Sequence, residues 1–264
     1  MSILEAIVLG IVQGLTEFLP VSSSGHLVLL HNVFGVSEPS LFFDTMLHFG
    51  TLIAVVAVLW RNILNLFKKP FSGLLYLIIA TIPAIIVTLL FKDFILLAFT
   101  GVFLGYGFLL TAVFLVSAEL LSNRISKKRD INAGIALAMG TMQALAIFPA
   151  VSRSGSTIAG GLVCGVGRKE AATFSFLMSI PAILGSVAMQ GYEIFKGSAI
   201  PTELLPTIIG MVCAAVSGFF AVKFMIALIS KKKLYGFAIY VTILGILVLL
   251  DQNVFGIINW AIIN

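Results

Sequence analysis

The chain has 264 residues, of which 60% are hydrophobic and only 10% are charged, and its mean hydropathy is +1.15. A soluble domain carries about 25% charged residues, so this composition excludes the soluble globular classes and favours an all-α polytopic membrane protein. The formal net charge is +5, but no aromatic-basic RNA-binding motif accompanies it, and we expect no nucleic-acid partner.

Six windows are long and apolar enough to cross a lipid bilayer, which takes about 20 residues per helix. In chain order they are 41–60, 73–91, 99–119, 171–191, 206–229 and 237–263. No Lys or Arg precedes the first apolar run, so we expect no cleavable signal peptide. Cys164 and Cys213 lie in apolar runs without a neighbouring ligand residue, and we interpret both as small hydrophobic residues.

Two further apolar segments, 2–35 and 131–166, are each interrupted in the middle by Pro, Ser and Gly. The interruptions read 20-PVSSSG-25 and 149-PAVSRSG-155. Pro removes a backbone donor and Gly permits unusual dihedral angles, so a helix should stop at each interruption. Non-helical backbone at membrane depth is tolerated only where it is buried in protein or lines a wet cavity. We therefore expect each segment to be a re-entrant helical hairpin that enters and leaves on the same side.

The two interrupted segments resemble one another, with Gln13 echoed by Gln143 and the Pro and Ser-x-Ser-Gly elements following in the same order. Each half of the chain then consists of one re-entrant hairpin and three transmembrane helices. Because three is an odd number, the second copy is inverted relative to the first, as in many transporters. The predicted boundaries are 1–264 for a single membrane domain, about 1–121 for the first repeat and about 131–264 for the second.

The positive charges predict the orientation in the membrane. Twelve of the 16 Lys and Arg residues fall on one face of this arrangement, whereas Lys92 and Lys196 fall on the other. The twelve are Arg61, Lys68, Lys69, Arg124, Lys127, Lys128, Arg129, Arg168, Lys169, Lys231, Lys232 and Lys233. Positively charged loops are cytoplasmic, so we expect a multi-pass membrane protein with both termini facing outward.

In an inverted repeat the two broken segments meet near the membrane midplane and form the functional site. The free N–H groups at the start of a helix bind anions, and the planar fork of an arginine suits bidentate contact with a phosphate. Both features are present in the two breaks. The residues that we expect to bind a phosphate-bearing substrate are Ser22, Ser24, Gly25, Ser152, Ser154 and Gly155.

The polar residues of the breaks suit phosphoryl transfer. Ser23 is the expected nucleophile, with His26 three residues later as proton acceptor or donor. Arg153 would stabilise the charge that spreads over the phosphoryl oxygens. Glu17 and the carbonyl oxygen of Gln13 would hold a divalent Mg²⁺ or Ca²⁺ ion, of unknown number, or Glu17 would instead orient His26. A plain Arg153–Glu17 ion pair joining the halves is the competing structural interpretation, but it does not account for the serines and the histidine.

Four other polar residues receive a structural interpretation. His31 lies at the end of an apolar arm and His48 within an apolar span, and we expect both to be satisfied structural histidines. Asp44 and Glu119 lie near span ends, where exposure at the interface explains them. The absence of any histidine after His48 excludes the membrane acid phosphatases that need a later one.

At these residues the chain resembles the undecaprenyl pyrophosphate phosphatase family of the bacitracin-resistance type. QGLTEFLPVSSSGH fits that family's (E/Q)-x3-E and P-V-S-S-[ST]-G-H motifs, and PAVSRSG fits its P-G-x-S-R-S-G motif. The resemblance continues at 43–55 and 170–182. It implies hydrolysis of undecaprenyl (polyprenyl) pyrophosphate to the monophosphate, which recycles the lipid carrier of cell-wall synthesis, with divalent-metal dependence and a site facing the periplasm. The functional positions that it implies are Glu17, Ser23, His26 and Arg153, supported by Gln13, Ser22 and Ser152.

The chain departs from the family pattern at two positions, where Gln13 replaces a common Glu and Ala150 replaces a usual Gly. The first departure weakens a two-carboxylate metal site. The architecture alone also fits a transporter or flippase of a phosphorylated lipid, and this alternative remains open at this point. A homodimer is possible.

Overall fold

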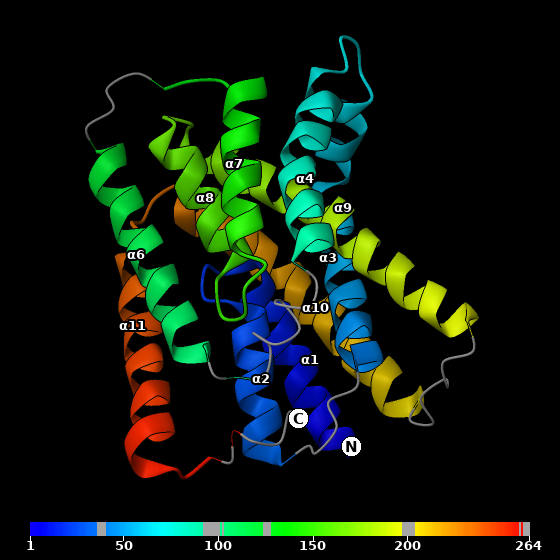
Figure 1. The fold of residues 1–264 in the computed structure, drawn as a ribbon. Helices are drawn as coiled ribbons and strands as arrows, with labels where there is room; N and C mark the ends of the chain where they lie inside the picture. The colour runs from blue at the N-terminus through cyan, green and yellow to red at the C-terminus, as the bar shows by residue number, and fades with distance from the viewer. Residues whose placement is uncertain are drawn as a thin grey trace.

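The computed structural model describes residues 1–35, 41–91, 101, 103–123, 128–196, 204–258 and 260. Within these ranges the chain folds into ten α-helices and a final π-helical turn (Figure 1). The helices are α1 (Ile3–Phe18), α2 (Ser23–Phe34), α3 (Leu41–Leu66), α4 (Ser72–Leu90), α6 (Leu104–Ser122), α7 (Ala133–Leu145), α8 (Arg153–Val163), α9 (Arg168–Phe195), α10 (Leu204–Ile229) and α11 (Tyr235–Leu250). The π-helical turn spans Asp251–Phe255.

Six of the helices, α3, α4, α6, α9, α10 and α11, are long and apolar enough to cross a membrane. They coincide with the six predicted windows, and so the prediction of an all-α polytopic membrane protein is confirmed. The predicted windows 99–119 and 237–263 extend into residues outside the described ranges, as do Lys92, Arg124 and Lys127 of the charge analysis. Cys164 and Cys213 are both free thiols, as expected.

The remaining four helices form two short helical hairpins. Helices α1 and α2 have 16 and 12 residues, and helices α7 and α8 have 13 and 11. All four are therefore shorter than the roughly 20 residues needed to span a bilayer. The α1–α2 hairpin occupies the lower half of the view in Figure 1 and the α7–α8 hairpin the upper half, with their turns pointing toward the middle of the molecule.

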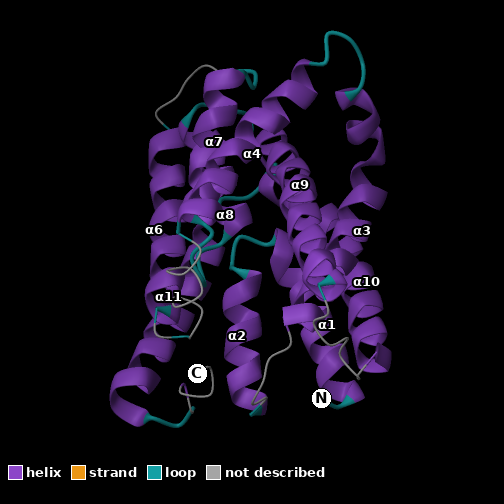
Figure 2. Cartoon of the chain, turned by 45° about the vertical axis from the view of Figure 1, so that its right-hand side comes forward, coloured by secondary structure: helices purple, strands orange, loops and turns teal. Residues whose placement is uncertain are grey.

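The two halves of the chain are interleaved (Figure 2). Helix α1 packs against α10, α4 against α7, α6 against α11, and α3 against both α9 and α10. The largest apolar core lies among these helices, and it includes Phe18 at the end of α1 and Phe176 of α9. Their rings meet edge to face at 5.3 Å between centroids. The last turn of α1 is thus fixed directly before the first break.

Two helix pairs are in backbone contact at small residues. A Cβ atom at Gly10 of α1 would lie 2.3 Å from the carbonyl oxygen of Gly210 in α10. A Cβ atom at Gly140 of α7 would lie 2.4 Å from the carbonyl oxygen of Ala80 in α4. A side chain at either glycine would force the helices apart, so these contacts determine how closely both hairpins approach the long helices.

The expectation that Glu119 is exposed at the interface was wrong. Its side chain is fully buried, and its two oxygens accept hydrogen bonds from Arg168 of α9 at 2.6 and 3.1 Å. Arg168 also donates to the carbonyl oxygens of Ile229 and Lys232, and the backbone N–H of Leu234 donates to Glu119 at 2.7 Å. This network joins α6, α9 and the turn between α10 and α11, which explains why the burial of a carboxylate is tolerated.

Candidate active site

The first break is built around Ser22, which caps α2. Its side-chain oxygen accepts a hydrogen bond from the backbone N–H of Gly25 at 3.3 Å, and its φ of 70° lies in the left-handed region. Gly25 is enclosed: a Cβ atom there would lie 2.6 Å from the Phe108 ring and 2.9 Å from Ala150 of the second break. The lack of a side chain at Gly25 therefore permits the two breaks to pack together.

The second break repeats this arrangement. Ser152 caps α8 by accepting a hydrogen bond from the N–H of Gly155 at 3.0 Å, and Ala150 has a φ of 61°. Ser152 and Ser154 are 3.2 Å apart at their hydroxyl oxygens, as Ser22 and Ser24 are at 3.3 Å in the first break. The Ser154 hydroxyl donates to the carbonyl oxygen of Leu19 at 2.9 Å, which joins one break directly to the other.

Thr111 of α6 supports the second break, a role that the sequence did not reveal. Its buried hydroxyl accepts a hydrogen bond from the backbone N–H of Ser152 at 2.9 Å. The same hydroxyl lies 3.1 Å from the carbonyl oxygen of Ala150, to which it can donate. A Thr inside an apolar helix gives no local signal of such a contact, because its partner is about 40 residues away in the sequence.

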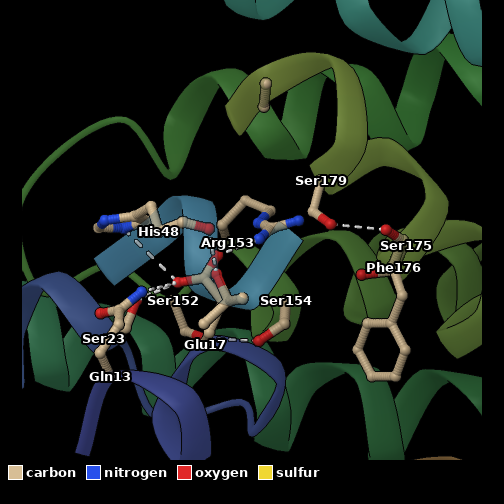
Figure 3. A network of polar contacts seen from close by, with 12 residues as sticks. Gln13, Glu17, Ser23, His48, Ser152, Arg153, Ser154, Ser175, Phe176 and Ser179 are labelled. Atoms are coloured by element: carbon tan, nitrogen blue, oxygen red, sulfur yellow. Dashed lines mark hydrogen bonds and ion pairs between the residues drawn. The ribbon is translucent and has the colours of Figure 1, made fainter. Parts of the chain in front are cut away.

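Glu17 is the centre of the site. Its Oε2 atom accepts hydrogen bonds from the Ser23 hydroxyl at 2.6 Å and from the Gln13 amide at 2.9 Å. Its Oε1 atom forms an ion pair with Arg153 from the second break. Figure 3 shows these side chains converging from three helices, α1, α2 and α8. The structure thus brings together the predicted nucleophile, the predicted carboxylate and the predicted arginine.

His48 of α3 belongs to the same cluster, although the sequence indicated only a structural histidine. Its Nε2 atom lies 3.6 Å from Glu17 Oε2, on the oxygen that also accepts the Ser23 proton (Figure 3). Its side chain is 29% exposed, whereas that of Glu17 is 5% exposed. Its place in an apolar run gives no local signal, because nothing there distinguishes a residue that faces the pocket from one that is packed.

These residues line a pocket of about 260 Å³. Its walls are formed by Glu17, Ser22, Ser23, Ser24, His48, Ala146, Ile147, Val151, Ser152, Arg153, Ala182, Ile183 and Ser186. The Nη1 atom of Arg153 is buried, and among the described residues it has no hydrogen-bond acceptor. A buried guanidinium nitrogen without a partner is costly, so its presence beside a pocket favours an anionic ligand there.

Both ring nitrogens of His26 contact groups other than the Ser23 hydroxyl, and its role as proton acceptor or donor stays a prediction. Its Nδ1 atom contacts the carbonyl oxygen of Ser22 at 2.6 Å and its Nε2 atom contacts the Tyr240 hydroxyl at 2.7 Å. A carbonyl oxygen only accepts, so Nδ1 carries the proton and Nε2 of the neutral ring accepts from Tyr240. The ring also stacks on Tyr240, with 5.7 Å between centroids. Its geometry fits a residue that positions the first break.

The residues around Glu17 do not by themselves fit a protein-held divalent ion. One observation favours an ion, namely that Gln13 Oε1 is buried without a hydrogen-bond partner among the described residues. However, the Glu17 carboxylate already contacts Ser23, Gln13 and Arg153, so waters and substrate phosphate oxygens would have to supply most of the six or more oxygen ligands of Mg²⁺ or Ca²⁺. The described residues also contain no cluster of three or more His, Cys, Asp and Glu side chains.

Among the described residues, six apolar helices that could cross a membrane surround a buried Ser–Glu–Arg cluster, and together they define a polytopic membrane protein with a polar centre. Residues 6–247 match the profile of the family described as bacitracin resistance protein BacA, and the chain belongs to that family. The chain is 47% identical over 254 residues to undecaprenyl-diphosphatase 3 of Bacillus cereus, which covers 96% of this chain and 98% of the relative. It is 44% identical over 256 residues to undecaprenyl-diphosphatase of Carboxydothermus hydrogenoformans, with the same coverage of both chains.

A more distant relative extends this similarity. Undecaprenyl-diphosphatase of Halothermothrix orenii is 39% identical over 259 residues, which is 97% of this chain and the whole of the relative. The similarity therefore runs through both hairpins and all six long helices, and the site residues lie well inside the matched range.

Proposed function

We propose that this protein is a membrane phosphatase that hydrolyses undecaprenyl, or another polyprenyl, pyrophosphate to the monophosphate and inorganic phosphate. The observation that carries the proposal is the contact of Ser23 and Arg153 with the same Glu17 carboxylate inside a pocket at the meeting point of the two hairpins. Membership of the BacA family and the names of the relatives support it.

Ser23 is the nucleophile in this proposal, and Glu17 is the group that receives its proton. The hydroxyl already donates to Glu17 Oε2 at 2.6 Å, which is within the range for general-base catalysis. Arg153 holds the phosphoryl group through its Nη1 atom, which has no acceptor in the described part of the chain, while its Nη2 atom stays paired with Glu17 Oε1. The guanidinium thus keeps the carboxylate in place and binds substrate at the same time.

The starts of α2 and α8 complete the phosphate site. Both helices begin at the pocket, with Ser23 and Arg153 as their first residues and with Ser22 and Ser152 as caps. Free N–H groups and the positive end of the helix dipole favour negative charge at such a position. Two helix starts facing one pocket suit a diphosphate, which has more negative charge than one helix start would balance.

The polyprenyl tail fits an apolar groove between α4 and α7. It has a volume of about 710 Å³ and is lined by Ile82, Pro83, Ile86, Val87, Phe91, Leu137, Thr141, Ala144, Leu145 and Phe148. The same short segment that follows α7 contributes Ala146 and Ile147 to the polar pocket. A lipid with its headgroup in the pocket would therefore lay its first isoprene units along this groove.

The architecture that we infer is a pair of inverted repeats, each with a re-entrant hairpin. The backbone contact of Gly10 with Gly210 has its counterpart in that of Gly140 with Ala80. Gly140 follows Gly10, and Gly210 follows Ala80, by the same number of positions as Gln143 follows Gln13. The shortness of the four hairpin helices and the identical Ser-x-x-Gly caps support the same inference.

The inverted repeats also support the predicted orientation in the membrane. An odd number of spans in each half, together with the positively charged loops, supports the inner membrane as the location and a position of both termini outside it. The homodimer stays a prediction.

The test is release of inorganic phosphate from undecaprenyl pyrophosphate by the purified protein in detergent. We expect turnover in the wild type. The rate of phosphate release should fall at least a hundredfold in Ser23→Ala, which lacks the nucleophile, and in Arg153→Lys, which lacks the planar guanidinium. Retained thermal unfolding temperatures would show that the variants are folded. Binding of the lipid without turnover in the wild type would contradict the proposal and favour a lipid transporter.

A further inference from the structure

We propose that Tyr240 of α11 is a positioning residue for the phosphatase reaction, and that it acts through His26 on the peptide unit that precedes the nucleophile Ser23. The inference rests on the proposed diphosphatase function. Tyr240 lies outside the set of residues that line the polar pocket, and its hydroxyl contacts a ring nitrogen of His26. The role therefore belongs to a side chain that supports the site from behind.

The imidazole ring of His26 is held on several sides. Its Nε2 atom lies 2.7 Å from the Tyr240 hydroxyl, and the planes of the two rings are within 10° of parallel. The ring of Phe108 from α6 meets it edge to face, with 5.5 Å between centroids. Its Nδ1 atom lies 2.6 Å from the carbonyl oxygen of Ser22. With both nitrogens bonded and its flanks packed, the imidazole is fixed in one orientation.

The Nδ1 contact connects this ring to the nucleophile. The carbonyl group of Ser22 belongs to the peptide unit that joins Ser22 to Ser23. The backbone N–H of His26 gives the same carbonyl oxygen only a longer hydrogen bond of 3.3 Å. Ser22 has a φ of 70°, and a residue other than glycine keeps such a conformation only when its surroundings hold it. The shorter Nδ1 bond therefore fixes the peptide plane from which Ser23 reaches Glu17 Oε2.

The Tyr240 hydroxyl keeps the ring in the orientation that makes this bond. Nδ1 carries a proton because a carbonyl oxygen only accepts, whereas a hydroxyl can pair with Nε2 either as donor or as acceptor. The clamp thus does not depend on the charge of the ring. Without the hydroxyl, Nε2 would lose its partner in a buried position, and the ring would gain by turning toward another one. Because both nitrogens belong to one rigid ring, that turn would break the Nδ1 bond to Ser22.

Space filling does not account for a tyrosine at position 240. The residue is 46% exposed, and a phenylalanine would cover the same surface. The hydroxyl of Thr242, two residues later, bonds to the carbonyl oxygen of Ala238 in its own helix. The hydroxyl of Tyr240 instead reaches α2, in the other half of the chain. What distinguishes the tyrosine is therefore this one contact.

The kinetic experiment compares Tyr240→Phe with the wild type, using undecaprenyl pyrophosphate in detergent and phosphate release as the readout. We expect kcat to fall by about 10- to 100-fold with KM changed less than about threefold, because the nucleophile is misplaced while the pocket is intact. The matched control is Tyr235→Phe in the same helix, which keeps the ring that contacts Lys233 and should retain kcat. The thermal unfolding temperatures of both variants should equal that of the wild type.

Nuclear magnetic resonance of protein labelled with ¹⁵N-histidine tests the path through His26. The chain has three histidines, and the signals of His26 are those that disappear in His26→Gln. In the wild type the Nδ1 proton should exchange slowly with water, because its 2.6 Å hydrogen bond is buried. In Tyr240→Phe its exchange should be at least about tenfold faster, since the ring is free to turn. This measurement needs no turnover.

The outcomes separate the two proposals. An inactive wild type would contradict the diphosphatase function itself, whereas unchanged kcat in Tyr240→Phe with an active wild type would overturn the role of Tyr240 alone. A loss of kcat with unchanged exchange of the Nδ1 proton would also overturn it, because the hydroxyl would then not act through His26. A loss of kcat/KM that appears entirely in KM would assign the hydroxyl to substrate binding instead. Lower kcat, little change in KM and faster exchange together are the expected result.

Discussion

The Ser23 hydroxyl donates to Glu17 Oε2 over 2.6 Å, although the two residues lie on different helices on either side of the first break. The turn between α1 and α2 reverses the chain and thereby brings the start of one helix against the end of the other. A nucleophile and its proton acceptor are thus supplied by residues only six positions apart. The arginine, by contrast, comes from the other half of the chain.

Replacing the central carboxylate should abolish turnover while preserving the shape of the site. In Glu17→Gln the side chain keeps its volume but no longer accepts the Ser23 proton or balances the Arg153 charge, and we expect kcat to fall by about 10²- to 10⁴-fold. Phosphate release measures this effect. The matched control is Glu5→Gln in the same helix, where Glu5 closes the capping box with Ser2. Equal losses in both variants would contradict a special role for Glu17.

Filling the groove between α4 and α7 should affect long substrates selectively. Thr141→Trp places a large ring among the groove residues and should raise KM for undecaprenyl pyrophosphate about tenfold, because about two buried CH₂ groups of the tail lose their contact. The KM for farnesyl pyrophosphate should change less. Val113→Trp, on the exposed face of α6, is the control and should change neither. Equal increases for both substrates in Thr141→Trp would argue against the tail path.

Gln13 should not set the metal requirement. The family resemblance implies that a chelator stops phosphate release, but the Gln13 amide donates to Glu17, and this contact does not present a second carboxylate to an ion. We therefore expect Gln13→Ala to lower kcat modestly while the Mg²⁺ concentration for half-maximal activity stays within about threefold of the wild-type value. Isothermal titration of the chelator-treated protein with Mg²⁺ gives a second readout. A shift of more than about tenfold in the Mg²⁺ concentration for half-maximal activity would indicate that Gln13 is a metal ligand.

The buried Glu119–Arg168 pair should be a large contributor to stability. Removal of one partner leaves the other charge buried, and Glu119→Ala should lower the free energy of unfolding by about 3–5 kcal/mol. Unfolding in detergent with increasing SDS measures this change. Lys169→Ala, at the exposed neighbour of Arg168, should stay within about 0.5 kcal/mol. The double variant Glu119→Ala with Arg168→Ala should be less destabilised than the two single effects added together.

Close packing of α1 against α10 should control activity from a distance. A Cβ atom at Gly14 would lie 2.5 Å from the carbonyl oxygen of Ala214, so Gly14→Ala must move α1 and with it Glu17. We expect a loss of about 1–3 kcal/mol in stability and of at least tenfold in kcat. Gly191→Ala in α9 is the control, because nothing lies within 4 Å of the added atom. It should raise stability by about 0.5–1 kcal/mol.

The sequence predicted the features that depend on local pattern. The six spans follow from hydropathy alone, and the two breaks follow from Pro and Gly within otherwise apolar segments. The prediction that Glu17, Ser23 and Arg153 lie together required only the assumption that the two breaks converge. Inverted orientation, metal dependence and dimerisation remain predictions, because they concern the membrane, an ion and a second chain.

The features that the sequence missed depend on the direction of side chains and on distant partners. His26 follows Ser23 by three positions, which suggests a catalytic pair, yet its ring turns toward Phe108 and Tyr240 from other helices. His48 lies in an apolar run, where nothing local distinguishes a pocket-facing residue from a packed one. Glu119 likewise gave no sign of its partner, which lies 49 positions later.

The interleaving of the two halves means that neither can hold a complete site. Helix α1 rests on α10 and α7 rests on α4, so a chain cut between α6 and α7 yields one fragment with the nucleophile and another with the arginine. During synthesis the first half enters the bilayer before the second half. Until the second half has been inserted, the polar α1–α2 hairpin lacks its contacts with the α7–α8 hairpin. The pocket therefore forms only once both halves have been inserted, and we expect a truncated product to be inert instead of partly active.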